Sequence, residues 1–131
     1  NAPVFKGGLS ETHQRWATGL LYDNINIEEI GGLGSFSRGA SGSRQGWAGG
    51  NVVTWNSTAP EIRLEIPPTP EQNFAIGCVL TQAESVRGNG YVHSLGIRVS
   101  PTSLFVQQLI DRVGREQAKV ILGGQSASLS R

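Results

Sequence analysis

The residues best suited to chemistry stand near the start of the chain, where His13, Arg15 and Trp16 lie within four positions. In an extended segment His13 and Arg15 point to one side and Trp16 to the other. An imidazole can remove a proton, a guanidinium binds a carboxylate bidentately, and an indole face stacks on a sugar. We therefore treat His13 and Arg15 as candidate catalytic residues and Trp16 as a candidate substrate-binding residue. The alternative is that Arg15 binds loop carbonyls while Trp16 packs beneath them.

A second group of candidates lies in the glycine-rich stretch 31–50. Arginines and an aromatic ring on an ordered loop can form a cleft for a saccharide. The candidate substrate-binding residues here are Arg38, Arg44, Gln45 and Trp47. Trp47 argues against disorder, because a large aromatic side chain needs a surface to pack on. The alternative is an elaborate turn whose arginines hydrogen-bond the backbone.

The acidic residues favour structural roles. Asp23, Glu28 and Glu29 are the candidates for the two carboxyl groups that a glycosidase requires. Glu28 and Glu29, however, are adjacent in an expected strand and should face opposite sides. Asp23 precedes Asn24 at an expected bend.

Asn56 begins an Asn-Ser-Thr sequon and is therefore a candidate N-glycosylation site. Asn24 and Asn56 can instead form a ladder of stacked amides at successive turns of the chain. In that case Asn56 is internal and cannot be modified.

No cofactor is expected. Cys78 is the single cysteine, so it cannot form an internal disulfide, and we expect it to be buried in an apolar strand. No His, Asp or Glu pattern has the spacing of a metal site. The 11 basic and 10 acidic side chains are nearly balanced and the arginines are scattered, so we expect neither nucleic acid nor a membrane as a partner.

Short apolar runs must position these side chains. Residues 20–24 are similar to residues 52–56, thirty-two positions later, and we align 74–78 with 52–56 at a further twenty-two positions. Repeated short strands predict stacked coils in which each coil buries a face on the next. With 18 glycines and little charge, the chain is expected to be all-β. Within 31–50 we expect no regular element except one short strand around 35–37.

The end of the chain changes to helical spacing, with apolar side chains at Leu104, Phe105, Leu109, Ile110 and Val113. Ser100 is the expected N-cap, Pro101 the first helical residue and Gly114 the residue that ends the helix. A second helical turn is expected over 116–122. The expected organisation is coils over 1–99, a helix over 100–122 that caps the open stack, and a flexible tail over 123–131.

Four motifs carry a resemblance to a known family, and they are HQRWATGLLYDN at 13–24, SRGASGSRQGWAGGNVVTWN at 37–56, PPTPEQNFAIGC at 67–78 and SPTSLFVQQLIDRVG at 100–114. In this order they resemble the C-terminal part of right-handed parallel β-helix proteins of the pectate-lyase superfamily, which are polysaccharide-lyase-like. The resemblance implies a short right-handed parallel β-helix with a long glycine-rich loop, from a secreted protein. The family has a histidine where this chain has Gln45, which puts any acid–base role at that position in doubt.

Three functions follow as hypotheses. The first is a carbohydrate-associated protein that cleaves a uronate polysaccharide by elimination, with His13 as base and Arg15 as the cation beside the substrate carboxylate. The second is a non-catalytic, lectin-like or interaction module that binds a polysaccharide or glycan. The third is a structural C-terminal part of a longer β-helix. Because an open stack exposes strand edges, a homo-oligomer or a companion chain is expected.

Overall fold

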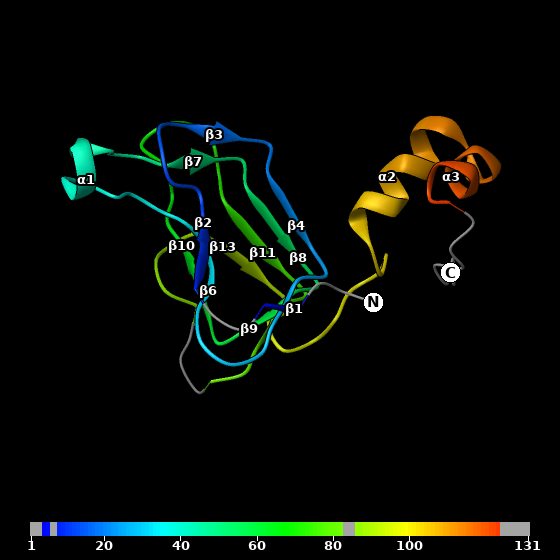
Figure 1. The fold of residues 1–131 in the computed structure, drawn as a ribbon, viewed down its shortest axis with the longest axis horizontal. Coiled ribbons are helices and arrows are strands. Elements are labelled where there is room, and N and C mark those ends of the chain that lie inside the picture. The colour runs from blue at the N-terminus through cyan, green and yellow to red at the C-terminus, as the bar shows by residue number, and fades with distance from the viewer. Residues whose placement is uncertain (1–3, 6–7, 83–85, 124–131) are drawn as a thin grey trace.

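The computed structural model describes residues 4–5, 8–82 and 86–123. Within these ranges the chain forms short strands that all pair in parallel, together with three helices (Figure 1). The expectation of an all-β chain built from parallel strands is confirmed in this sense. Among the described helices none combines the length and the hydrophobicity needed to cross a membrane.

Four sheets run through the stack. The first has the order β1 (Val4–Phe5), β5 (Asn26–Ile27), β9 (Thr58–Ala59) and β12 (Val79–Leu80). The second has the order β2 (Leu9–Glu11), β6 (Gly32–Ser35) and β10 (Glu61–Leu64). The third has the order β4 (Leu21–Asp23), β8 (Val53–Trp55), β11 (Phe74–Ile76) and β13 (Tyr91–His93). The fourth pairs β3 (Ala17–Thr18) with β7 (Gly49–Gly50).

The register confirms the first sequence repeat and corrects the second. Leu21 pairs with Val53, which is the expected spacing of thirty-two residues. Val53 pairs with Phe74, a spacing of twenty-one residues rather than twenty-two. Gly77, and not Cys78, therefore stands at the position of Asn56. A shift of one residue moves every side chain to the other face of a strand, and the observed register places Ala75 and Cys78 in the core.

The glycine-rich stretch contains more regular structure than expected. β6 is the buried central strand of the second sheet, whereas the sequence predicted only a short strand around 35–37. Stacking is so close here that a Cβ on Gly32 would lie 2.3 Å from Glu61 O. The close approach of the neighbouring strand therefore requires glycine at this position. Secondary-structure propensity does not predict this requirement.

The hydrophobic core is formed by side chains that point inward from or beside the strands of the first three sheets. Its fully buried members are Ile27, Leu33, Ala59, Ile62, Leu64, Ala75 and Cys78. Burial raises the pKa of the Cys78 thiol, and its Sγ donates to Thr54 O over 3.4 Å. Cys78 is buried, as expected, but it lies between β11 and β12 rather than within a strand.

A row of left-handed turn residues follows the third sheet. Asn24, Asn56, Gly77 and Ser94 each come directly after a strand of this sheet, and their φ values are 56°, 45°, 67° and 53°, respectively. The Asn24 and Asn56 amides do not bond to one another as the ladder hypothesis supposed. They donate instead to a segment that we call the strap, residues 96–103, which runs back across these turns.

The strap leads into two helices, α2 (Leu104–Val113) and α3 (Arg115–Ile121), and Gly114 ends α2 as expected. α2 begins three residues later than predicted. Its N-cap is Ser103, whose Oγ accepts from Val106 N over 3.1 Å, whereas Ser100 and Pro101 belong to the strap. Residues 100–103, which the sequence analysis assigned to the start of the helix, belong to the strap instead.

The helices do not cap the stack as expected. They extend away from it on the side of β4, and Phe105, Val120 and Ile121 are 50%, 71% and 53% exposed (Figure 1). The reason is their anchor, because the start of α2 is held by Asp23 on β4. The expected flexible tail lies, from residue 124 onward, outside the described residues.

Candidate functional site

The long loop over 37–47 projects from the outer side of the second sheet. Ser37 and Trp47 form an antiparallel bridge at its base, and Arg38 N donates to Gly46 O over 2.7 Å. A single helical turn, α1 (Ser41–Arg44), forms its tip. The loop is an ordered excursion from the stack, as the presence of Trp47 suggested.

Arg38 fastens this loop to the sheet. Its guanidinium donates to Gln45 Oε1 within the loop and to Glu11 Oε1 on β2. Gln45 is only 8% exposed, so it serves the loop rather than the surface. Arg44 lies exposed at the tip, away from this contact. Arg38 and Gln45 thus hold the loop together, although Arg38 bonds two side chains and not the backbone groups that the alternative supposed.

Glu11 also brings His13 to the same place. His13 Nδ1 lies 3.4 Å from Glu11 Oε1, the oxygen that accepts from Arg38, while the imidazole side chain is 59% exposed. His13 and the loop candidate Arg38 are therefore joined through one carboxylate. Glu11 was absent from the sequence candidates, since nothing local marks it.

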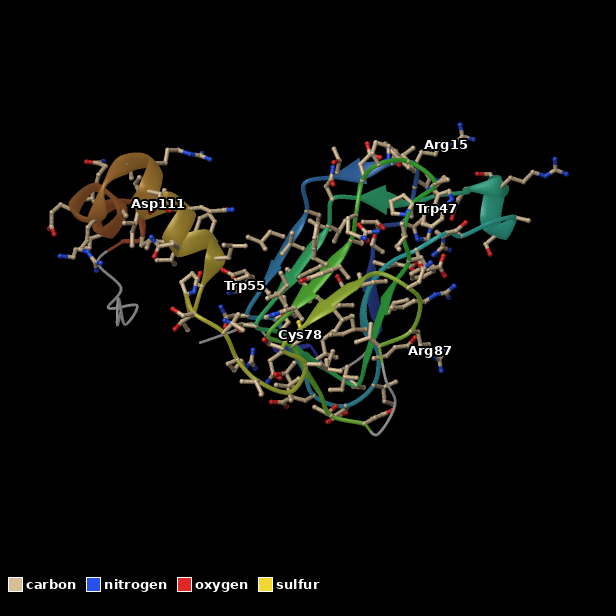
Figure 2. All side chains as sticks on the ribbon, turned by 180° about the vertical axis from the view of Figure 1, so that it is seen from behind. Arg15, Trp47, Trp55, Cys78, Arg87 and Asp111 are labelled. Carbon is tan, nitrogen blue, oxygen red and sulfur yellow. The ribbon has the colours of Figure 1, made fainter. Side chains whose placement is uncertain are left out.

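Arg15 and Trp16 are not in the extended segment that the sequence argument assumed. Their φ values are 22° and 64°, so they form a left-handed turn before β3, and the side-chain alternation of a strand does not apply. Trp16 is 38% exposed. Figure 2 shows Arg15 and Trp47 on the side of the stack that faces α1, opposite to α2 and α3.

The outer face of β10 carries a set of paired charges next to the loop. Arg63 Nη2 donates to Glu65 Oε1 over 2.7 Å, and its guanidinium carbon lies 3.9 Å from the centre of the Phe36 ring. Glu65 Oε2 accepts from Ser37 N over 3.0 Å, which ties this face to the base of the loop. Farther along, Arg87 Nε lies 3.6 Å from Glu61 Oε1.

A shallow cavity of about 360 Å³ opens beside this face. Its lining residues are Trp47, Glu65, Ile66, Gly88 and Asn89. Only Trp47 was among the sequence candidates. The alternation of charged and apolar residues over 61–65 predicts that Arg63 and Glu65 share one outer face of the strand. Asn89 comes from a turn later in the chain, and no local pattern indicates it.

The remaining candidates have structural positions. Asp23 binds the start of α2, and Glu28 and Glu29 are exposed near the end of β5. Asn56 is 1% exposed, and its amide nitrogen donates to three strap carbonyls. It is therefore internal, and an internal asparagine is not accessible for glycosylation. Among the described residues no group of three His, Cys, Asp or Glu side chains is arranged to hold a metal ion.

Comparisons with models of protein families, with curated protein sequences and with solved structures found no match to this chain.

Proposed function

We propose that this chain is the terminal part of a right-handed parallel β-helix and a carbohydrate-associated protein related to the pectate-lyase superfamily. The parallel register across successive coils supports the β-helix. Parallel strands joined by crossover connections are right-handed almost without exception. The row of left-handed residues after β4, β8, β11 and β13 supports a regular repeat of one turn per coil. An extracellular location would suit a glycan partner.

The proposed activity is the binding of a saccharide in the cavity beside the end of β10, at the base of the loop over 37–47. The observation that carries this proposal is the position of Trp47 beside a cavity whose wall is a carboxylate and an amide. Aromatic faces pack against the C–H groups of sugars, and planar polar side chains exchange hydrogen bonds with hydroxyls. A cavity of about 360 Å³ is at the lower end of the range for ligand pockets.

The ion pairs that the arginines form favour saccharide binding over cleavage by elimination. A lyase needs a guanidinium or another cation that is available to the substrate carboxylate while a base removes the neighbouring proton. Arg38 and Arg63 already bind Glu11 and Glu65. Arg15, the cation of the lyase hypothesis, lies in the turn before β3 and does not line the cavity. His13 is the remaining base candidate, and its ring faces Glu11 rather than an open arginine.

The test is a titration of the chain with neutral and acidic oligosaccharides by calorimetry, with ultraviolet absorbance followed for an unsaturated product. Saturable binding without product supports the proposal. Product formation that is abolished by His13→Ala would replace it with the lyase hypothesis. The absence of binding to every saccharide in the series would overturn it.

A second candidate function, assembly, rests on the two ends of the stack. In the described part of the chain β4 and β13 are the outermost strands of the third sheet, each with one side not paired to another strand. Leu20 beside β4 and Tyr91 on β13 are 38% and 48% exposed. All strands run in parallel, so the β13 edge of one copy is suited to the β4 edge of a second copy.

Sedimentation velocity over a range of concentrations tests this assembly. Growth from monomer to higher species, suppressed by a Val92→Pro variant that blocks the β13 edge, supports head-to-tail stacking. A single monomeric species at every concentration contradicts it.

A further inference from the structure

The residues that line the cavity beside Trp47 also indicate which class of sugar it binds. Resting on the proposed saccharide binding, we infer that this cavity is a subsite for an uncharged sugar ring and that it discriminates against uronates. The inference concerns specificity, because the sequence resemblance had suggested a uronate polymer.

The backbone that carries the aromatic wall of the subsite is held in place. Trp47 is bridged to Ser37, and Ser37 N donates to Glu65 Oε2 over 3.0 Å. The ring is partly exposed and borders the cavity together with Ile66, which is 40% exposed. These two side chains offer an apolar surface to the C–H face of a sugar.

The polar wall offers both an acceptor and a donor. The Glu65 carboxylate accepts from Arg63 and from Ser37, and a carboxylate has room for about four hydrogen bonds. Asn89 Oδ1 accepts from Ile66 N over 2.9 Å, which fixes the amide while its Nδ2 has no partner among the described residues. A sugar hydroxyl can therefore donate to Glu65 and accept from Asn89.

The third wall is backbone. Gly88 has a φ of 93°, and a Cβ at this position would lie 2.0 Å from Leu64 O. Glycine is therefore needed for the turn that brings Asn89 beside β10, and it leaves the cavity without a side chain on that side.

The charge of these walls excludes a sugar carboxylate. A uronate here would face the Glu65 carboxylate, and the Arg63 guanidinium is already bound to that carboxylate. Arg38 and Arg87 are likewise paired with Glu11 and Glu61. Arg15 and Arg44 do not line the cavity. Like charges at close range with no unpaired cation are unfavourable, whereas neutral hydroxyls satisfy the same groups.

The experiment compares calorimetric affinities for neutral hexasaccharides of β-linked glucose, xylose and mannose with those for hexagalacturonate. We expect at least one neutral hexasaccharide to bind about tenfold more tightly than hexagalacturonate. Trp47→Ala should weaken that binding about tenfold, since the stacking surface is lost, while Trp47→Phe should retain most of it. Phe105→Ala is the matched control, because Phe105 is also an exposed aromatic residue but lies on α2 and does not line the cavity, and it should leave the affinity unchanged.

A second variant reports on charge. Glu65→Gln removes the negative charge and keeps an acceptor, so the affinity for hexagalacturonate should rise relative to that for the neutral hexasaccharide. Circular dichroism establishes that each variant is folded. If Trp47→Ala is not, Trp47→Leu takes its place, because leucine keeps apolar bulk but lacks the ring face and should also weaken the binding.

The outcomes separate the two proposals. Tighter binding of hexagalacturonate, or neutral binding that neither Trp47 variant changes, overturns the neutral subsite and leaves saccharide binding standing. The absence of binding to all the hexasaccharides overturns both.

Discussion

Asn56 and Val99, which are 43 residues apart, exchange two hydrogen bonds: Asn56 Nδ2 donates to Val99 O over 2.8 Å, and Val99 N donates to Asn56 Oδ1 over 2.9 Å. The same Nδ2 also donates to Pro101 O and Thr102 O. One buried side chain therefore holds the strap against the turns of the stack, and the strap in turn sets where α2 begins.

Replacement of Asn56 should destabilise the chain strongly. Asn56→Gly keeps the left-handed turn but leaves strap N–H and C=O groups without partners, and we expect a loss of about 3 kcal/mol in the free energy of unfolding. Asn56→Ala should cost about 1 kcal/mol more, because alanine disfavours the φ of 45°. Denaturant titration measures both. The control is Asn51→Gly, at an exposed left-handed position, and an equal loss there would contradict the role of the amide.

The start of α2 should depend on Ser103 and Asp23, and not on Ser100. Ser103→Ala removes the N-cap acceptor for Val106 N and should cost about 1 kcal/mol, whereas Ser100→Ala should cost less than about 0.5 kcal/mol. Asp23→Ala should cost about 2 kcal/mol, since its carboxylate accepts from Leu104 N and Phe105 N at the positive end of the helix. Hydrogen exchange of the α2 amides should report the loss locally. Equal effects of the two serine variants would refute the assignment of the cap.

Glycine in β6 should be irreplaceable for steric reasons. Gly32→Ala places a Cβ 2.3 Å from Glu61 O, and the resulting separation of two coils should cost about 3 kcal/mol. Gly39→Ala is the comparison, because a Cβ there meets no heavy atom within 4 Å and only the positive φ opposes it, at about 1 kcal/mol. Thermal unfolding of the two variants distinguishes the effects. A Gly32→Ala variant as stable as Gly39→Ala would show that the coils are not so closely stacked.

Cys78 should make the fold sensitive to alkali. Burial raises the pKa of Cys78 in the folded chain above the ordinary value of 9.0. At pH values between 9.0 and the pKa of the folded chain, the unfolded chain releases a proton that the folded chain retains. The contribution of Cys78 to the free energy of unfolding is therefore fully present below pH 9.0. It falls as the pH rises toward the pKa of the folded chain, by at most about 1.4 kcal/mol per pH unit. Cys78→Ala should flatten this decline in denaturant titrations at several pH values. Tyr22, whose pKa is also raised by burial, should preserve a decline above its ordinary value of 10.0. An unchanged pH profile in Cys78→Ala would contradict the prediction.

The sequence predicted those parts of the fold that depend on neighbours along the chain. The repeat between 20–24 and 52–56 marks two coils that pair in the predicted register. The helical spacing over 104–113 and the glycine at 114 define α2 and its end, because helix periodicity and a left-handed terminus are local properties. The loop over 37–47 was expected to be ordered from Trp47 alone.

The candidate site was predicted only in part. Trp47, Arg38 and His13 were recognised by residue type, but their partners Glu11, Glu65 and Asn89 come from other coils. A stack of coils brings together residues that are twenty to thirty positions apart, and the spacing changes from coil to coil. Residue type alone also could not show that Arg38 is used to fasten the loop.

What the sequence determined by itself was therefore the set of elements with a local signature: short repeated strands, a terminal pair of helices and an ordered glycine-rich loop. Only the tertiary structure decided that Gly32–Ser35 is a central strand, that α2 begins at Leu104 after the strap, and that Asn56 is internal. Each of these depends on a contact between distant segments, namely the close approach of Glu61, the carboxylate of Asp23 and the backbone of Val99. Such contacts leave no pattern in the neighbouring sequence, because the partner that imposes them lies in another coil.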